Sequence, residues 1–148
     1  MSILRIGAHR GAMAHAPENT LAAFDKAIHF GTYRIEFDLR RSRDGHIVVI
    51  HDATVERTTD GAGVVRDMDL AQLQSLRSDG EPIPSFAEAI DCMRGRARML
   101  IELKDEDIAE QVVGQIEAAG VVDQCTISTF HEPSLRRVHE LNTEIEVA

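Results

Sequence analysis

The sequence of 148 residues lacks any apolar run that approaches the ~20 residues needed to cross a bilayer. Its N-terminal segment also lacks the long apolar stretch and the small-residue cleavage site of a secretory signal peptide. These two absences predict a cytoplasmic protein with no transmembrane segment. Cysteine is scarce as well. Cys92 and Cys125 are too few for a disulfide framework or a cysteine-based metal site, so we expect both to be buried, reduced and chemically inert.

Basic residues are outnumbered by acidic ones. The chain has 16 lysines and arginines against 25 aspartates and glutamates, which gives a net charge of -9. Proteins that bind nucleic acids in general carry basic patches that displace counterions, so this composition argues against that class. An acidic protein can still bind an anionic substrate where a bound divalent metal makes the site locally positive.

Short apolar or alternating segments take turns with helical patterns along the chain. The expected strands cover residues 3–8, 35–39, 47–50, 99–104 and 126–130, and a further strand opens at 144–148. Strand–helix alternation implies a parallel sheet covered by helices, which fits either a doubly wound sheet or a (β/α) barrel. We interpret residues 1–148 as one domain in which a polar, turn-rich stretch at about 43–84 is an insertion subdomain.

Local signals mark where the expected helices begin and end. Asn19 is a good N-cap for the first helix, and Gly31 is placed to close it. Ser85 and Glu88 form a capping box at the start of another helix. Pro133 is expected in the first turn of the last helix. These signals divide the chain into about four strand–helix units.

Three carboxylates lie near the carboxyl ends of two expected strands. Period-two alternation places Glu36 and Asp38 on the face opposite the apolar residues, and Glu102 is placed in the same way on its own strand. In a (β/α) barrel this end of the strands is the active-site face. Uncompensated burial of neighbouring carboxylates costs several kcal/mol, which a hard cation such as Mg²⁺ or Ca²⁺ offsets. The sequence therefore predicts a metal site there.

Two histidines and two cationic residues follow or end the same strands. His9 and His51 are candidates for proton transfer because histidine titrates near neutral pH. Arg10 and Lys104 could hold a phosphate or a developing negative charge. Two alternatives stay open: the histidines cap or pack, and Arg10, Lys104 or Arg34 neutralises the carboxylates in an ordinary salt-bridge network.

Five ordered motifs closely resemble the glycerophosphodiester phosphodiesterase family: His9-Arg10-Gly11, Pro17-Glu18-Asn19-Thr20, Glu36-Phe37-Asp38, Asp44-Gly45 with His51-Asp52, and Glu102-Leu103-Lys104. Their order and approximate spacing match as well, and the resemblance covers essentially the whole chain. It implies a TIM barrel with an inserted subdomain after the second strand. Glu18 and Asp52 match the motifs, and we expect supporting roles for them.

The resemblance also implies roles for individual residues. The metal ligands for Mg²⁺ or Ca²⁺ are three carboxylates: Glu36, Asp38 and Glu102. His9 and His51 are the general acid–base pair, and Arg10 and Lys104 contact the phosphate. The implied reaction splits a small-molecule glycerophosphodiester, such as glycerophosphocholine or glycerophosphoethanolamine, into glycerol 3-phosphate and an alcohol.

The chain is short for this fold. A full barrel has eight βα units and ~250 residues, so the expected fold is α/β, the N-terminal portion of a TIM barrel with about four to five units. Open sheet edges and an uncovered apolar interior are expected to favour self-association, and we expect a truncated chain. Two other functions stay open: a phosphodiesterase of the phospholipase C or D type, and an inactive metal- or partner-binding module.

Overall fold

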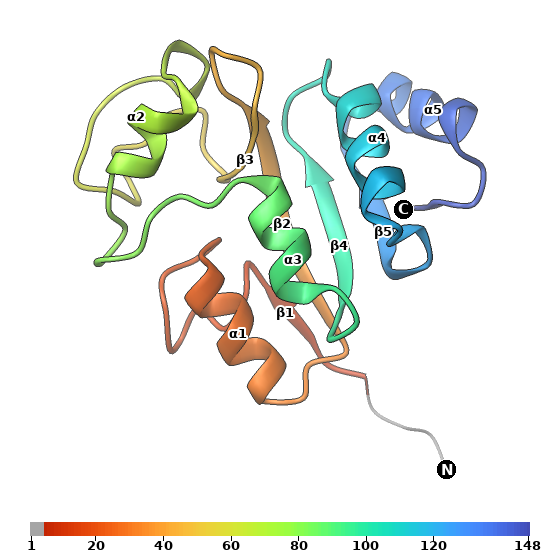
Figure 1. Ribbon diagram of the computed structural model, residues 1–148, viewed down its shortest axis with the longest axis horizontal. Coiled ribbons are helices and arrows are strands. Elements are labelled where there is room, and N and C mark those ends of the chain that lie inside the picture. The colour runs from red at the N-terminus through yellow and green to blue at the C-terminus, as the bar shows by residue number, and fades with distance from the viewer. Residues whose placement is uncertain (1–4) are drawn as a thin grey trace.

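A parallel sheet organises the chain. The structure, a computed structural model, describes residues 5–148, so the start of the first expected strand lies outside the described residues. Five strands run parallel in the order β1-β2-β4-β5-β6 (Figure 1). These strands are β1 (Gly7–His9), β2 (Arg34–Arg41), β4 (Arg98–Leu103), β5 (Cys125–Ser128) and β6 (Glu146–Val147). Strand β3 (Ile47–Val49) pairs antiparallel with β2.

A helix connects each parallel strand to the next. The connecting helices are α1 (Leu21–His29), α3 (Phe86–Met93), α4 (Ala109–Ala119) and α5 (Glu132–Leu141). A short 3-10 helix (Val122–Gln124) leads into β5. Figure 1 shows α1, α3 and α4 on the same side of the sheet. The expected α/β alternation is therefore confirmed: four strand–helix units are followed by a fifth parallel strand.

The two faces of the sheet differ in chemistry. On β2, Ile35, Phe37 and Leu39 have no exposed surface and pack in the main core with the helices. The opposite face is mainly polar, contrary to the apolar interior expected from the sequence, because most of its positions carry charged or hydroxyl residues; Leu100 of β4 and Gly7 of β1 are exceptions. The residues in register across that face include Arg34 and Arg98, Asp38 and Glu102, and Thr126 and Glu146. The Thr126 hydroxyl donates to Glu146 Oε2 at 2.7 Å.

The helix caps match the sequence signals with one exception. The capping box of Ser85 and Glu88 is present, and Pro133 lies in the first turn of α5 as expected. Helix α1, however, is capped by Thr20, whose hydroxyl oxygen accepts from the N–H of Ala23 at 3.2 Å. The prediction that Asn19 caps this helix is wrong, because Asn19 lies one residue earlier at φ +57° and its side chain turns elsewhere.

The segment between β2 and α3 has a small core of its own. It contains β3, a 3-10 helix (Val65–Asp67) and α2 (Leu70–Ser75). Six apolar residues form a second buried cluster: Val48, Ile50, Val55, Val65, Leu73 and Ile83. Figure 1 shows this segment beyond the carboxyl end of β2, on the side away from β5. A separate core agrees with an insertion at about 43–84. That this segment forms a subdomain of its own stays a prediction.

Two local expectations need correction. Strand β5 ends at Ser128, so Phe130 lies in the following loop, where it is 98% exposed. Cys125 is buried as expected, and burial raises its pKa to about 12, but Cys92 is only half-buried. Both cysteines are free thiols. Within residues 5–148, no helix combines the length and the apolar character needed to span a membrane.

Candidate active site

Strands β2 and β4 bring three carboxylates together. Asp38 lies in register with Glu102, and Glu36 lies two residues earlier on β2, on the same face. One carboxylate oxygen from each residue lies within 4.8 Å of the other two. Asp38 is fully buried, whereas Glu36 and Glu102 are partly accessible. The geometry thus places the three acidic residues selected from the sequence around one point.

Both expected cations touch this cluster. The backbone N–H of Arg10 donates to Glu36 Oε2 at 3.0 Å, and Arg10 Nε lies 3.3 Å from Asp38 Oδ2. Lys104 Nζ lies 2.7 Å from Glu102 Oε1 and 3.5 Å from Asp38 Oδ1. The salt-bridge alternative is therefore partly realised, through Arg10 and Lys104.

The cluster remains under-compensated despite these cations. Burial raises the pKa of the Glu36 carboxyl, and the nearby Asp38 carboxylate raises it further. Asp38 Oδ1 is buried and accepts no hydrogen bond from the part of the chain that the structure describes. A buried carboxylate oxygen that has an ion pair with Lys104 at 3.5 Å but no hydrogen bond is incompletely compensated. The all-oxygen donor set suits a hard divalent cation, so these residues fit a metal.

A strained turn after β1 aims Arg10 at the cluster. Arg10 has φ +54° and Gly11 has φ +83°. A Cβ atom on Gly11 would lie 2.7 Å from Ala23 Cβ and 2.8 Å from the Ala23 carbonyl carbon, so only glycine fits against α1 here. This close contact lets the chain reverse and presents the Arg10 N–H to Glu36.

Asn19 belongs to the site, although the sequence signals indicated a helix cap. Its amide nitrogen donates to Asp38 Oδ2 at 2.9 Å, and the Asn19 residue is only 4% exposed. Asparagine tolerates the left-handed conformation that this position requires. The signal that could have identified this role is Thr20, because threonine is also a favoured N-cap residue. With Thr20 as the cap, the Asn19 amide is free for another partner.

The two histidines occupy different surroundings. His9 ends β1, its Nε2 lies 3.7 Å from Glu36 Oε2, and its side chain is 60% exposed. His51 follows β3, and its Nδ1 lies 2.6 Å from Asp52 Oδ1. The main chain of His51 is also anchored, because Arg40 Nε donates to the His51 carbonyl at 2.8 Å. His9 therefore borders the carboxylates directly, whereas His51 is oriented by Asp52.

Arg57 is the second residue that the sequence reading missed. Arg57 bonds two carboxylates at once, those of Asp52 and Glu18, and Glu18 Oε1 also accepts from Arg10 Nη1 at 3.1 Å. Hydrogen bonds from Arg57 hold the pKa values of both carboxyls below their usual range. No local pattern identifies Arg57, because it lies in the aperiodic part of the insertion.

The charges of the whole site do not balance. Five carboxylates gather in it: Glu18, Glu36, Asp38, Asp52 and Glu102. Three permanent cations contact them: Arg10, Arg57 and Lys104. These side chains leave two negative charges, which a single divalent cation would neutralise.

A cavity of about 260 Å³ adjoins the cluster on the β5 side. Its lining includes Glu102, Lys104, Thr129, Phe130 and His131. The Thr129 hydroxyl donates to the Leu103 carbonyl at 2.9 Å, which ties the β5–α5 loop to the end of β4. The site therefore opens onto a space bordered by one of the expected metal ligands, one of the expected phosphate contacts and an aromatic side chain.

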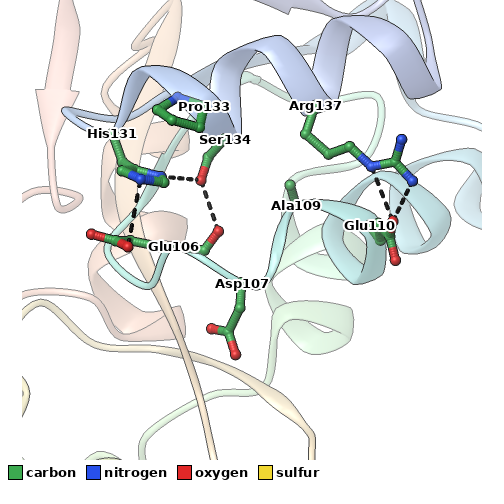
Figure 2. A pocket seen from close by; sticks show the side chains of 8 residues that line it. All are labelled: Glu106, Asp107, Ala109, Glu110, His131, Pro133, Ser134 and Arg137. Atoms are coloured by element: carbon green, nitrogen blue, oxygen red, sulfur yellow. Dashed lines mark hydrogen bonds and ion pairs between the residues drawn. The ribbon is translucent and has the colours of Figure 1, made fainter.

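A second cavity, of about 220 Å³, lies between α4 and α5 (Figure 2). There His131 Nδ1 lies 2.8 Å from Ser134 Oγ, and His131 Nε2 lies 3.5 Å from Glu106 Oε2. The resemblance to a serine nucleophile is superficial, because the buried Ser134 hydroxyl donates to the Glu106 carbonyl at 2.8 Å. That hydroxyl is held as a structural bridge, and none of the residues selected from the sequence lines this cavity.

Comparison with known proteins identifies the family. The sequence model of the glycerophosphoryl diester phosphodiesterase family matches residues 9–148. The chain belongs to this family. A glycerophosphodiester phosphodiesterase from Caldanaerobacter subterraneus is 34% identical, over 95% of this chain and 63% of that protein. The chain therefore spans somewhat less than two thirds of the length of this relative.

Solved structures of phosphodiesterases share the fold. The crystal structure of a glycerophosphodiester phosphodiesterase from Agrobacterium tumefaciens superposes with a TM-score of 0.91 at 35% identity, over 98% of this chain and 66% of that one. A phosphodiesterase from Oleispira antarctica, solved in complex with the product sn-glycerol-3-phosphate, gives a TM-score of 0.83 at 31% identity, over 99% and 64%. With its parallel strands and covering helices, this member of the family has the fold of the N-terminal portion of a TIM barrel.

Proposed function

We propose that the chain takes part in metal-dependent hydrolysis of glycerophosphodiesters to glycerol 3-phosphate and an alcohol. One observation carries the proposal: Glu36, Asp38 and Glu102 converge at the carboxyl ends of two parallel strands, between Arg10 and Lys104. The name of the Caldanaerobacter relative and the product bound to the Oleispira phosphodiesterase support this choice of substrate class.

In this proposal Glu36, Asp38 and Glu102 hold Mg²⁺ or Ca²⁺. When bound, the metal polarises the phosphoryl oxygens and so makes phosphorus easier to attack. Lys104 Nζ and the Arg10 guanidinium are the cations that bind the remaining phosphate charge, because they already contact the same carboxylates. Their placement lets them orient the phosphate and stabilise the charge that develops on it.

His9 and His51 are proposed as the acid–base pair. Asp52 accepts from His51 Nδ1–H, which leaves Nε2 of the neutral ring free to take or return a proton. The exposed His9 imidazole is accessible to an oxygen of a bound substrate. One histidine would remove the proton from the attacking hydroxyl or water, and the other would protonate the leaving oxygen.

Three wider expectations stay predictions. The cytoplasmic location and the insertion subdomain at about 43–84 are proposed on the basis of the sequence alone. Pairing of two copies through the sheet edges is a further expectation, which sedimentation equilibrium of residues 1–148 tests directly.

A second candidate function is a metal-binding module without turnover. The observation that favours it is the pairing of Arg10 and Lys104 with the carboxylates, because such ion pairs can serve a metal site that performs no chemistry.

The deciding experiment measures glycerol 3-phosphate released from glycerophosphocholine, with Mg²⁺ or Ca²⁺ and with chelator. We expect metal-dependent release that His9→Ala and Glu36→Ala abolish. Glu144→Gln, which changes an exposed carboxylate far along the chain from the cluster, is the control and should leave release unchanged. Release that survives chelation contradicts the metal role. Metal-dependent melting without any release favours the binding module.

A further inference from the structure

Four hydrogen bonds from one guanidinium join two loops of the site. Arg57 Nε and Nη2 donate to the two oxygens of Asp52 at 2.6 and 3.0 Å. Arg57 Nη1 and Nη2 donate to the two oxygens of Glu18 at 3.0 and 2.8 Å. Glu18 belongs to the β1–α1 loop and Asp52 to the segment after β3. The planar fork of arginine suits two bidentate carboxylates, whereas a lysine ammonium cannot reproduce this arrangement.

One arm of this network reaches His51. Asp52 Oδ1 accepts bonds from both Arg57 and His51 Nδ1. An aspartate carboxylate is ionised at neutral and alkaline pH even without Arg57, and an ionised carboxylate can only accept a hydrogen bond. The hydrogen on the neutral His51 ring must then lie on Nδ1. Arg57 donates to both oxygens of Asp52 and so holds Oδ1 where it accepts from His51 Nδ1–H. By this geometry Arg57 helps to select the His51 tautomer, although it does not touch the ring.

The other arm reaches the carboxylate cluster. Glu18 Oε1 accepts from Arg57 and from Arg10 Nη1, and Arg10 in turn contacts Asp38 and, through its backbone, Glu36. The Glu18 side chain is only 18% exposed, so its charge requires such partners. Without Arg57, Glu18 would keep only its ion pair with Arg10. The Glu18 side chain would then be less firmly held, and Arg10 could shift with it.

We infer that Arg57 is a positioning residue that orients His51 through Asp52 and Arg10 through Glu18. The inference rests on the proposed function and deepens it. The Arg57 side chain is about half-exposed, so solvent screens part of what its ion pairs contribute to stability. Its effect is therefore expected in the geometry of the two catalytic groups more than in the stability of the fold.

The chain offers a matched control. Arg43 also lies in the segment after β2, is 56% exposed, and forms a two-pronged bond to Asp69 at 2.9 and 2.7 Å. Neither Arg43 nor Asp69 contacts the carboxylate cluster or the two histidines in the described residues. Arg43→Ala thus removes the same chemical group from a similar surface without touching the proposed site.

The experiment compares Arg57→Ala, Arg57→Lys and Arg43→Ala with the unaltered chain. In metal-dependent turnover, we expect Arg57→Ala to lower kcat by about tenfold to a hundredfold, as is typical when an outer-shell partner is lost, and to raise KM. Arg57→Lys should recover only part of the loss, and Arg43→Ala should leave both constants unchanged. Because Arg57 and Asp52 share the path to His51, the double variant with Asp52→Asn should lose less in kcat than the two single losses multiplied together.

A second readout does not require turnover. Ring nitrogen NMR at alkaline pH reports the tautomer of neutral His51, which we expect to be the Nδ1–H form in the unaltered chain and a mixture in Arg57→Ala. An unchanged His51 tautomer and unchanged kcat and KM in Arg57→Ala would overturn the inference. If the unaltered chain releases no glycerol 3-phosphate, the proposed function fails, while the tautomer comparison still decides whether Arg57 positions His51.

Discussion

Glu36→Gln is predicted to stabilise the metal-free protein while it removes a metal ligand. Glu36 lies within 4.8 Å of two other carboxylates, and at an effective dielectric constant of about 20 each such pair repels by about 3 kcal/mol. The hydrogen bond from the Arg10 N–H to the charged Glu36 carboxylate offsets about 2 kcal/mol of this repulsion. In Glu36→Gln the side-chain amide oxygen can still accept this hydrogen bond. After partial solvent screening, we expect a net gain of about 1–3 kcal/mol.

The sign of the pH dependence follows from the raised pKa of Glu36. A carboxyl whose pKa is higher in the folded state stabilises the fold at pH values below its unfolded pKa, and this contribution is lost as the pH rises through the folded pKa. The advantage of Glu36→Gln should therefore be greatest at pH 7.5 and should shrink as the pH falls toward 4.5, the usual value for glutamate.

Thermal melting measures both effects. In chelator at pH 7.5, a gain of 1–3 kcal/mol corresponds to a Tm increase of about 3–10 °C for a chain of this size. Added Mg²⁺ or Ca²⁺ should raise the Tm of the unaltered chain and have little effect on Glu36→Gln. Glu144→Gln, which replaces an exposed carboxylate, should have the same Tm as the unaltered chain under all of these conditions. A lower Tm for metal-free Glu36→Gln at pH 7.5 would refute the reasoning.

Two further substitutions test how the loops support the cluster. Gly11→Ala should lower the free energy of unfolding, measured by urea titration, by about 2–4 kcal/mol. Alanine is strained at φ +83°, and its methyl group would lie 2.7 Å from Ala23 Cβ. Gly31→Ala, at φ +73° with open space around it, should lower the free energy of unfolding by less. Asn19→Ala should cost about 1–3 kcal/mol by leaving buried Asp38 without its 2.9 Å donor. Equal losses for the two glycines, or no loss for Asn19→Ala, would contradict this description of the loops.

Sequence periodicity predicted the acidic cluster because its geometry is nearly local. Alternation on β2 fixes the face of Glu36 and Asp38, and parallel pairing brings Glu102 into register with Asp38. The helices were predictable for the same reason, since the capping box of Ser85 and Glu88 is encoded within four residues. Such features depend on neighbours in the chain or on one strand pairing.

The rest of the site depends on long-range contacts. Arg57 meets Glu18 across 39 positions of the sequence, and no repeating pattern in the insertion marks that meeting. Asn19 and Thr20 are both good N-caps, and only the position of Asp38 decides which one turns inward. The expected apolar interior was wrong because most strand positions that face away from the helices, Leu100 being an exception, carry charged or hydroxyl side chains.

Isothermal titration of Mg²⁺ and Ca²⁺ into the chain tests the central claim most directly. The unaltered chain is expected to bind one divalent ion, and Asp38→Asn, which removes a charge from the most buried ligand, should bind it at least about tenfold more weakly. Circular dichroism should show that both proteins are folded. Absence of binding to the unaltered chain, or equal affinity in Asp38→Asn, would contradict a metal site built from these three carboxylates.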